Sequence, residues 1–356
     1  MTNIGSFPLK WVAWETTKKC NLKCIHCRSN ADASHFDTVD TKKAIELMEK
    51  VAEFARPVFV LTGGEPLLRG DIFELAKYGT KLGFKMAMAT NGSLVTDEVC
   101  EKIKGSGIKI ISLSLDGPGA EAHDNFRKQK GSFDAVISAA EKFRAHGIEF
   151  LINSSFTKRN QPYIEDTYLL ARKLGAKAWY MFIVVPMGRG KGLLDELISR
   201  EDYEKILKWH YNMEIKEHEI LVRPTCAPSY YRIFAEEQKK SGNNSDRRKL
   251  SFSPGGGKGC VAGQSIAYIS AEGDVYPCSY FTGPGGNIFR QKFSEIWESG
   301  LFKSFRDYSD YKSRCGVCDY RNTCGGCRAR ALIYDNDLKS NDPYCGYVPA
   351  SWEAVK

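Results

Sequence analysis

Three cysteines near the N-terminus, Cys20, Cys24 and Cys27, constrain this chain more than any other feature. They form a C-x3-C-x2-C loop directly after 12–16, an apolar run that predicts a β-strand. A [4Fe-4S] cluster bound by only three cysteines leaves its fourth iron open to a non-protein ligand, which substrate chemistry at an iron-sulfur centre needs. The alternatives are three unrelated thiols or a zinc site. Zinc would need a fourth ligand close by, and His26 lies inside the loop.

From residue 12 to about residue 184, short apolar or β-branched runs alternate with longer amphipathic stretches, as in repeated β-α units around a parallel sheet. Six such units, rather than eight, predict an α/β fold with an open or partial TIM-like (β/α)6 barrel, whose functional loops gather at the carboxyl ends of the strands. The expected strands are 12–16, 58–61, 85–89, 108–115, 148–156 and 178–184. The expected helices are 41–53, 72–82, 96–104, 133–145 and 164–174. Their expected caps are Asp40 or Thr41 at the first start and Gly83, Gly147 and Gly175 at later ends.

The composition changes after one more expected helix at 201–219. Residues 236–253, rich in Lys, Ser and Asn, predict a mobile linker or loop, which 255–259 continue. Seven of the twelve cysteines lie beyond it, in a part with few periodic segments, so metal sites would supply much of its stability. We therefore expect a barrel at 1–220 and a linker with a cysteine-rich domain at 221–356.

Twelve cysteines in short spacings, and an N-terminus without a secretory signal, predict a cytosolic protein whose thiols bind metal. No apolar run reaches about 18 residues, so no membrane segment is expected. The net charge of +8, from 51 Lys and Arg against 43 Asp and Glu, would suit a polyanionic ligand. The basic residues are spread along the chain without a recognition motif, which argues against nucleic-acid binding.

The cysteine loop resembles the cluster-binding motif of the radical S-adenosylmethionine (SAM) superfamily, with His26 at a position that is usually aromatic. The segment Gly63-Gly64-Glu65-Pro66, after the second expected strand, looks like the GGEP motif of that family, whose polar groups hold the SAM amino group. Glycines let the backbone approach a ligand closely, and a carboxylate pairs with an ammonium group. A simple turn is the alternative for these four residues.

Further polar residues on or after the expected strands are similar to family positions that line SAM. By this resemblance, Arg127 would supply a cation to the SAM carboxylate, and Asn153 or Ser155 would contact the ribose. The alternatives are a surface salt bridge for Arg127 and ordinary strand hydrogen bonds for the other two. The remaining expected contacts are Thr90, Asn91, Ser112, Ser114 and Asp116.

A second cysteine array lies near the C-terminus and resembles the SPASM domain, with which radical SAM enzymes hold auxiliary iron-sulfur clusters. The family more often has three residues between the last two cysteines of the central run, whereas Cys324 and Cys327 have two between them. A zinc ribbon is the alternative, because CxxC pairs suit zinc equally well. The array comprises Cys260, Cys278, Cys315, Cys318, Cys324, Cys327 and Cys345.

The SPASM resemblance divides these cysteines between two clusters. One cluster would be bound by Cys315, Cys318, Cys324 and Cys345. The other would be bound by Cys260, Cys278 and Cys327, with an undetermined fourth ligand. Cys226 is the candidate for that position, and a lone buried thiol is the alternative. Cys100, in an expected helix, is assigned to the core.

Segments 11–17, 56–62, 180–182 and 188–190 resemble the haem-pathway branch of this superfamily, in particular the SAM-dependent haem synthases of the sirohaem-derived route. The resemblance implies oxidative decarboxylation of two propionates of iron-coproporphyrin III to vinyl groups, which gives haem b. Only nineteen residues precede Cys20, which argues against the peptide substrates of members with an N-terminal peptide-binding domain. The alternatives are a haem d1-type enzyme, a peptide or sulfatase maturase, or a non-enzymatic zinc-ribbon interaction protein.

The haem-synthase reaction implies a [4Fe-4S] cluster that reduces SAM, a 5′-deoxyadenosyl radical that takes hydrogen from the propionate, and an auxiliary cluster that receives the surplus electron. A low-potential donor such as ferredoxin or flavodoxin would supply the first electron. Arg127, Arg189 and Arg223 are candidates for binding propionates. Sequence alone selects neither a catalytic residue nor a histidine for the porphyrin iron. Candidates for stacking on the macrocycle, or alternatively for core packing, are Trp179, Tyr180 and Phe182.

Overall fold

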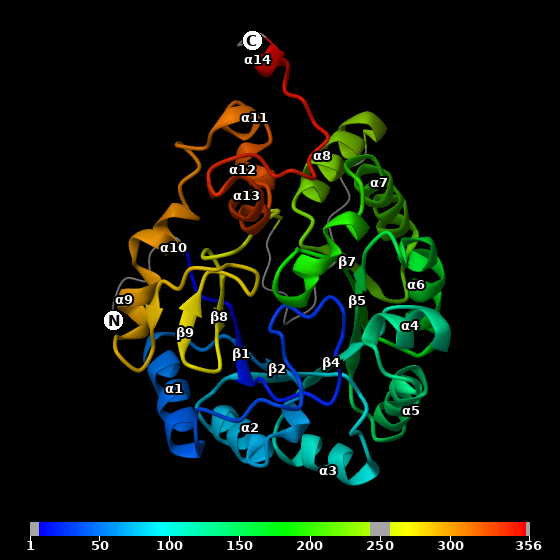
Figure 1. Ribbon diagram of the computed structural model, residues 1–356, viewed down its shortest axis with the longest axis vertical. Coiled ribbons are helices and arrows are strands. Elements are labelled where there is room, and N and C mark those ends of the chain that lie inside the picture. The colour runs from blue at the N-terminus through cyan, green and yellow to red at the C-terminus, as the bar shows by residue number, and fades with distance from the viewer. Residues whose placement is uncertain (1–6, 243–256, 354–356) are drawn as a thin grey trace.

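A curved sheet forms the frame of the structure, a computed structural model that describes residues 7–242 and 257–353 (Figure 1). Its strands are β1 (Trp11–Thr17), β2 (Val58–Gly63), β3 (Lys85–Thr90), β4 (Ile110–Ser114), β5 (Phe150–Phe156), β6 (Ala178–Ile183), β7 (Leu221–Thr225), β8 (Ile266–Ile269), β9 (Asp274–Tyr276) and β10 (Gly286–Asn287). Neighbouring strands from β1 to β7 pair in chain order and run parallel. The order β10-β9-β8-β1-β2-β3-β4-β5-β6-β7 leaves β10 and β7 as edges, so the barrel is open.

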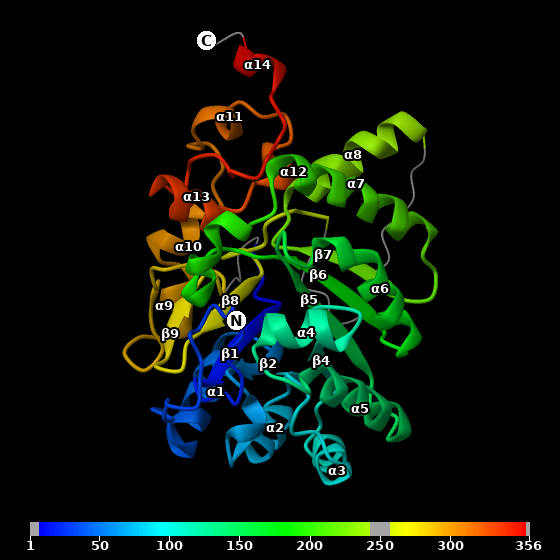
Figure 2. The same cartoon turned by 45° about the vertical axis from the view of Figure 1, so that its right-hand side comes forward.

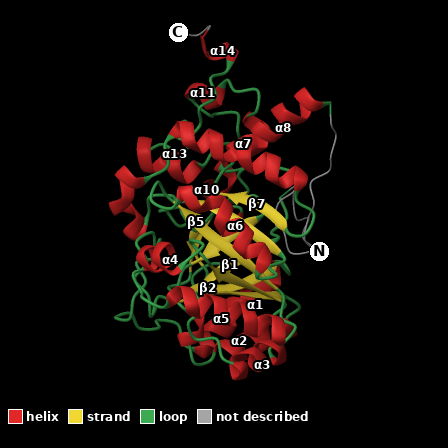
Figure 3. Ribbon diagram, turned by 90° about the vertical axis from the view of Figure 1, so that its right-hand side faces the viewer, coloured by secondary structure: helices red, strands yellow, loops and turns green. Residues whose placement is uncertain are grey.

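Helices pack on the outer face of the sheet, and Figure 3 shows α1, α2, α3 and α5 together on one side of the strands. The helices are α1 (Thr41–Phe54), α2 (Ile72–Lys81), α3 (Asp97–Gly105), α4 (Ala120–Arg127), α5 (Ser132–Ala145), α6 (Ile164–Lys173), α7 (Arg200–Lys216), α8 (Ser229–Ser241), α9 (Phe293–Trp297), α10 (Gly300–Ser304), α11 (Ser313–Gly316), α12 (Arg321–Cys324), α13 (Arg328–Asp335) and α14 (Ala350–Glu353), with 3-10 helices η1 (Pro66–Leu68), η2 (Gln161–Tyr163) and η3 (Gly188–Glu196). None of the helices in the described ranges has the length and apolar character needed to cross a membrane.

The predicted α/β partial barrel is confirmed, with all six expected strands and the five helices between them present. The caps also agree with the sequence. The side chain of Asp40 accepts a hydrogen bond of 2.8 Å from the backbone N–H of Lys43 at the start of α1. Gly83, Gly147 and Gly175 follow α2, α5 and α6 with φ of +88°, +67° and +83°, a conformation that glycine adopts without strain.

The sheet extends beyond the six expected strands at both sides. β7 adds to β6, and β8 pairs in parallel with β1, so strands from the second half of the chain complete the sheet of the first. The expected boundary at residue 220 between the barrel and the C-terminal domain stays a prediction. The expected linker at 236–253 is wrong for 236–241, which belong to α8, because this helix packs against α7. Residues 243–253 of that linker, and 255–256 of its expected continuation, lie outside the described residues.

Side chains alternate between the two faces of each strand and so form two apolar layers. On β4, Ile111 and Leu113 face the helices and join the large outer core. Ile110 faces the barrel interior, where it packs in a smaller apolar layer with residues from the neighbouring strands. Ser112 and Ser114 follow Ile110 on this interior face, so the barrel becomes polar toward the carboxyl ends of its strands.

Candidate active site

The cysteine loop follows β1 and therefore lies at the carboxyl end of the barrel, where the sequence placed it. Its shape is fixed by backbone hydrogen bonds from Cys20 to the carbonyl of Asp32, 2.9 Å, and from Cys27 to the carbonyl of Cys24, 3.3 Å. Cys20 and Cys24 are each only 8% exposed. Burial raises the pKa of Cys20 to about 11 and also raises that of Cys24. Iron binding by these thiols must therefore displace protons.

The GGEP segment fastens the chain that leads into the cysteine loop. The backbone N–H of Gly64 donates to the carbonyl of Thr17 at 2.7 Å, and that of Glu65 donates to the carbonyl of Lys19 at 2.9 Å. A Cβ atom at Gly63 would lie 2.3 Å from the Thr17 oxygen, and one at Gly64 would lie 2.2 Å from the Lys19 oxygen. The close approach that these glycines permit is thus an approach to the protein's own backbone.

The buried carboxylate of Glu65 joins the ends of two strands. Its Oε1 accepts a hydrogen bond of 2.9 Å from the Thr90 hydroxyl, and its Oε2 accepts one of 2.8 Å from the backbone N–H of Asn91. The amide of Asn91 donates to the side chain of Asn21, in the cysteine loop, at 2.9 Å. Burial raises the pKa of Glu65, and these hydrogen bonds partly offset the rise. The expected residues Glu65, Thr90 and Asn91 therefore come together beside the loop.

A buried charged group lies after β4. Asp116 accepts a hydrogen bond of 2.6 Å from Nε of Arg127, and both side chains are buried, so the surface salt bridge considered for Arg127 is wrong. The ring of His26 stacks on Phe126 with centroids 4.4 Å apart, and its Nε2 lies 4.0 Å from Asp116. Burial lowers the pKa of His26 to about 4, so the ring is neutral at pH 7. Arg127 lowers the pKa of Cys24, against the larger effect of burial.

Three residues that the sequence suggested as substrate contacts instead interact with other parts of the protein. Nε of Arg189 donates to the carbonyl of Cys24 at 2.8 Å, so this side chain positions the cysteine loop. The guanidinium of Arg223 pairs with Glu214, which offsets its charge. Trp179 is fully buried in the outer core, because it alternates with its neighbours on β6 and faces the helices. These positions argue against Arg189 and Arg223 as propionate ligands and against Trp179 as a stacking surface.

The other expected residues of β4, β5 and β6 share the interior face. In the sheet register, Asn153 pairs with Ser114 on one side and with Tyr180 on the other. Ser155 pairs with Phe182 in the same way. These side chains are partly exposed at the carboxyl end of the barrel. They form a polar and aromatic wall at the carboxyl end of the barrel, and their contacts with SAM stay predictions.

The C-terminal cysteines gather in two groups, of which the first includes Cys226. Cys226, Cys260 and Cys278 pack against the apolar cluster that contains Cys327, and the Cys327 thiol acts on the pKa of each of them. We call these four the first thiol group. Cys226 has a left-handed backbone, with φ of +56°, and its carbonyl accepts a hydrogen bond of 2.7 Å from Arg330. Burial raises the pKa of Cys226, and the Cys327 thiol raises it further. The fold therefore brings a fourth thiol to the three that the sequence assigned.

The second thiol group, Cys315, Cys318, Cys324 and Cys345, lines one pocket near α11, α12 and the C-terminal loop. The backbone N–H of Cys260 donates to the carbonyl of Cys324 at 3.2 Å and so links the two groups. Figures 1 and 2 show α11, α12 and α13 gathered beyond β8, away from α2 and α3. No three His, Cys, Asp or Glu side chains in the described part of the chain converge as ligands of a single metal ion. A four-iron cluster instead takes its thiolates at separate corners.

Arg28 is a candidate site residue that the sequence reasoning missed. Its guanidinium lies over the ring of Tyr268, 4.2 Å from the centroid, and its Nη1 donates a long hydrogen bond of 3.5 Å to the carbonyl of Ser279. Burial lowers the pKa of Arg28, but Tyr268 and Glu15 outweigh that effect and the net shift is upward. Arg28 therefore lies between the cysteine loop and the first thiol group. Its only signal in the sequence is its place directly after Cys27.

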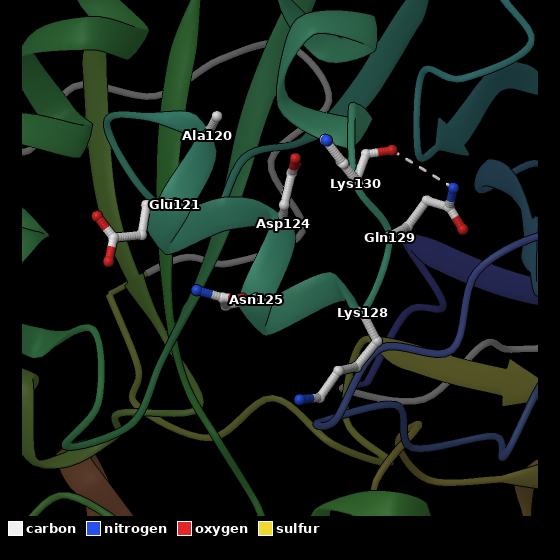
Figure 4. Close-up of a pocket in the computed structure, with 7 residues that line it drawn as sticks. All are labelled: Ala120, Glu121, Asp124, Asn125, Lys128, Gln129 and Lys130. Carbon is white, nitrogen blue, oxygen red and sulfur yellow. Dashed lines mark hydrogen bonds between the residues drawn. The ribbon is translucent and has the colours of Figure 1, made fainter.

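An open pocket on the outer side of α4 does not belong to this site. Figure 4 shows its seven lining residues, none of which is an expected site residue. Among them, Asp124 accepts hydrogen bonds from the backbone N–H groups of Gly131, 2.7 Å, and Phe133, 2.8 Å. Asp124 thus fastens the start of α5, and the pocket follows from the turn between the two helices.

Comparison with known proteins now identifies the family. The profile of the radical SAM superfamily matches residues 14–187, and that of the SPASM iron-sulfur cluster-binding domain matches 260–327. An AdoMet-dependent heme synthase of Methanosarcina barkeri is 41% identical over 340 residues, which are 95% of this chain and 96% of the relative. The chain belongs to the radical SAM superfamily.

Another AdoMet-dependent heme synthase, of Nitratidesulfovibrio vulgaris, is 38% identical over 353 residues, 97% of this chain and 94% of the relative. The radical SAM fold is shared with SAM-bound Streptococcus suis SuiB, with a TM-score of 0.74 and 19% identity over 96% of this chain and 78% of that one.

As a radical SAM enzyme with a SPASM domain, the protein uses SAM, a [4Fe-4S] cluster and auxiliary iron-sulfur clusters. The residues fit these groups. Cys20, Cys24 and Cys27 present three thiols on one loop, and the guanidinium groups of Arg127 and Arg189 lie beside it, where they offset the negative charge of thiolate-bound iron. The two thiol groups each bring together four cysteines, and their roles as cluster ligands stay predictions. The individual SAM contacts stay predictions.

Proposed function

We propose that this protein is a SAM-dependent haem synthase, which converts two propionates of iron-coproporphyrin III to vinyl groups and yields haem b. One observation carries the proposal: 41% identity to a heme synthase over nearly the full length of both chains. Each propionate loses one hydrogen atom, carbon dioxide and one electron. An unactivated propionate C–H bond is beyond the reach of a side-chain base, so the reaction needs radical chemistry.

The protein's own residues divide this task between two places. When bound, SAM and the N-terminal cluster supply the abstraction of a hydrogen atom. Arg189 and Asn91 hold the cysteine loop for this step, through hydrogen bonds to Cys24 and Asn21. The first thiol group would hold an auxiliary cluster, which would supply an acceptor for the surplus electron. The substrate would lie between these places, near Arg28, and a low-potential donor such as ferredoxin or flavodoxin would reduce the N-terminal cluster.

The proposed function is tested with the anaerobically reconstituted, reduced protein, SAM and iron-coproporphyrin III. We expect 5′-deoxyadenosine together with a porphyrin that has lost two carboxyl groups, which mass spectrometry detects. A chemical oxidant for the auxiliary clusters should increase the number of turnovers. If 5′-deoxyadenosine accumulates while the porphyrin keeps all four carboxyl groups, the substrate assignment is wrong.

We expect the Arg28→Gln variant to bind iron-coproporphyrin III about tenfold more weakly or worse, because one charge-assisted hydrogen bond to a propionate is lost. The measurement is the KM for this substrate, together with titration of its absorption band. Arg56→Gln is the matched control, because Arg56 is exposed near the amino end of β2 and carries the same charge. Iron content and cleavage of SAM without substrate should stay at the wild-type level in both variants. An unchanged KM in Arg28→Gln would remove Arg28 from the propionate site.

A further inference from the structure

Arg328 adjoins both C-terminal thiol groups. It directly follows Cys327, which belongs to the first group. Its side chain reaches the second group, where Nη2 donates to Sγ of Cys315 at 3.7 Å. One residue thus adjoins a thiol of each auxiliary site.

The charge of Arg328 is buried without a carboxylate beside it. The side chain is only 1% exposed, and its Nη1 donates to the carbonyl oxygens of Leu338, 3.0 Å, and Ser340, 2.6 Å. Within 7–242 and 257–353, no Asp or Glu oxygen lies within 4.0 Å of its guanidinium nitrogens. The nearby Asp342 already forms a buried ion pair with Arg330 at 2.9 Å. A buried cation is costly unless it is offset. The guanidinium lies 4.4 Å from the centroid of the Tyr311 ring, and Tyr311, Asp342 and the thiols of Cys315 and Cys260 all favour its charged form. The two thiols become full anions when they bind iron.

We propose that Arg328 is the shared counter-cation of the two auxiliary clusters and raises the reduction potential of both. A positive charge and an N–H···S hydrogen bond stabilise the added electron of a reduced cluster, so both contributions act in the same direction. The cluster on the second thiol group receives the side-chain hydrogen bond and should respond more. Because the charge is shared, reduction of one cluster also makes reduction of the other less favourable. The inference depends on the auxiliary clusters and not on the identity of the substrate.

The test is a redox titration of the reconstituted holoprotein followed by electron paramagnetic resonance. The N-terminal cluster is recognised by the change in its signal when SAM is added. In Arg328→Gln we expect both auxiliary potentials to become more negative. For the cluster on the second thiol group, the one-electron reduction equilibrium should shift at least tenfold, which corresponds to 59 mV. Arg328→Lys keeps the charge but loses the planar fork of donors, so its potentials should lie between those of the wild type and those of Arg328→Gln.

Arg314→Gln is the matched control, because it removes the same charge from the residue directly before Cys315. The side chain of Arg314 donates to the carbonyls of Tyr347 and Cys345 and not to a sulfur atom, so its loss should shift the equilibrium by much less than tenfold. Equal shifts in Arg314→Gln and Arg328→Gln would overturn the proposal, as would unchanged potentials in Arg328→Gln. If Arg328→Gln and Arg328→Lys both lose auxiliary-cluster iron, Arg328 is a folding residue and the proposal also fails.

Discussion

Replacing Cys24 by alanine is expected to abolish the cleavage of SAM to 5′-deoxyadenosine. Cys24 supplies one of the three thiols of the loop, and its backbone carbonyl is held by Arg189. A cluster left with two thiolates loses its anchor as well as the geometry that keeps one iron open for SAM. The loss of activity should exceed the roughly 10- to 100-fold that removal of an outer-shell partner costs at a metal site. The measurement is 5′-deoxyadenosine formed by the anaerobically reconstituted variant with excess reductant.

Cys100→Ala is the matched control for this variant. Cys100 is the one cysteine in α3, is completely buried, and packs in the outer core, which contains no other cysteine. Its replacement should leave SAM cleavage and iron content at wild-type levels, at the cost of a small core cavity. Iron counting should also show that Cys24→Ala loses about four iron atoms and keeps the auxiliary iron. Wild-type SAM cleavage by Cys24→Ala would contradict the assignment of the cysteine loop.

The sequence was sufficient for the six inner strands because each is a run of apolar or β-branched residues that ends in a turn. It did not reveal β7, which has only five residues and contains Arg223 and Pro224. Nor did it reveal β8, whose four residues become a strand through pairing with β1, far away in the chain. Such strands are defined by their partners rather than by their own periodicity, which local patterns cannot report.

The residues of the candidate site likewise fall into those that the sequence located and those that only the fold placed. The spacing of three cysteines located the cysteine loop, and resemblance to the family motif identified the GGEP segment, since in each case the residues are neighbours in the sequence. The roles of the arginines were harder to predict, because the position of a guanidinium depends on residues far away in the sequence. Arg127, at the end of α4, pairs with Asp116, and Arg189 holds the cysteine loop. Arg28 lies over the ring of Tyr268 on β8, the strand next to β1. A sequence shows that arginines are present, but only the fold shows which ones are already bound.

Cys226→Ala is expected to uncouple SAM cleavage from formation of the vinyl product. Cys226 lies near Cys327 in the first thiol group, and the other three thiols would leave one iron of that cluster without a protein ligand. The altered cluster should accept the surplus electron poorly, so we expect roughly 10- to 100-fold less decarboxylated porphyrin per 5′-deoxyadenosine. SAM cleavage itself should persist, because the N-terminal loop is intact. The measurement is the ratio of the two products, with Cys100→Ala as the control.

Spectroscopy distinguishes a ligand role of Cys226 from that of a buried thiol. If Cys226 is a ligand, its removal changes the signal of one auxiliary cluster and lets an added small thiol or imidazole bind the freed iron. If Cys226 is only a buried thiol, its removal leaves a cavity the size of one sulfur atom and an unchanged spectrum. The left-handed backbone at Cys226, held by Arg330, favours the ligand role, because a strained conformation at a non-glycine residue persists where the surrounding structure enforces it. An unchanged spectrum together with unchanged coupling would return Cys226 to the core and leave the first cluster with three protein ligands.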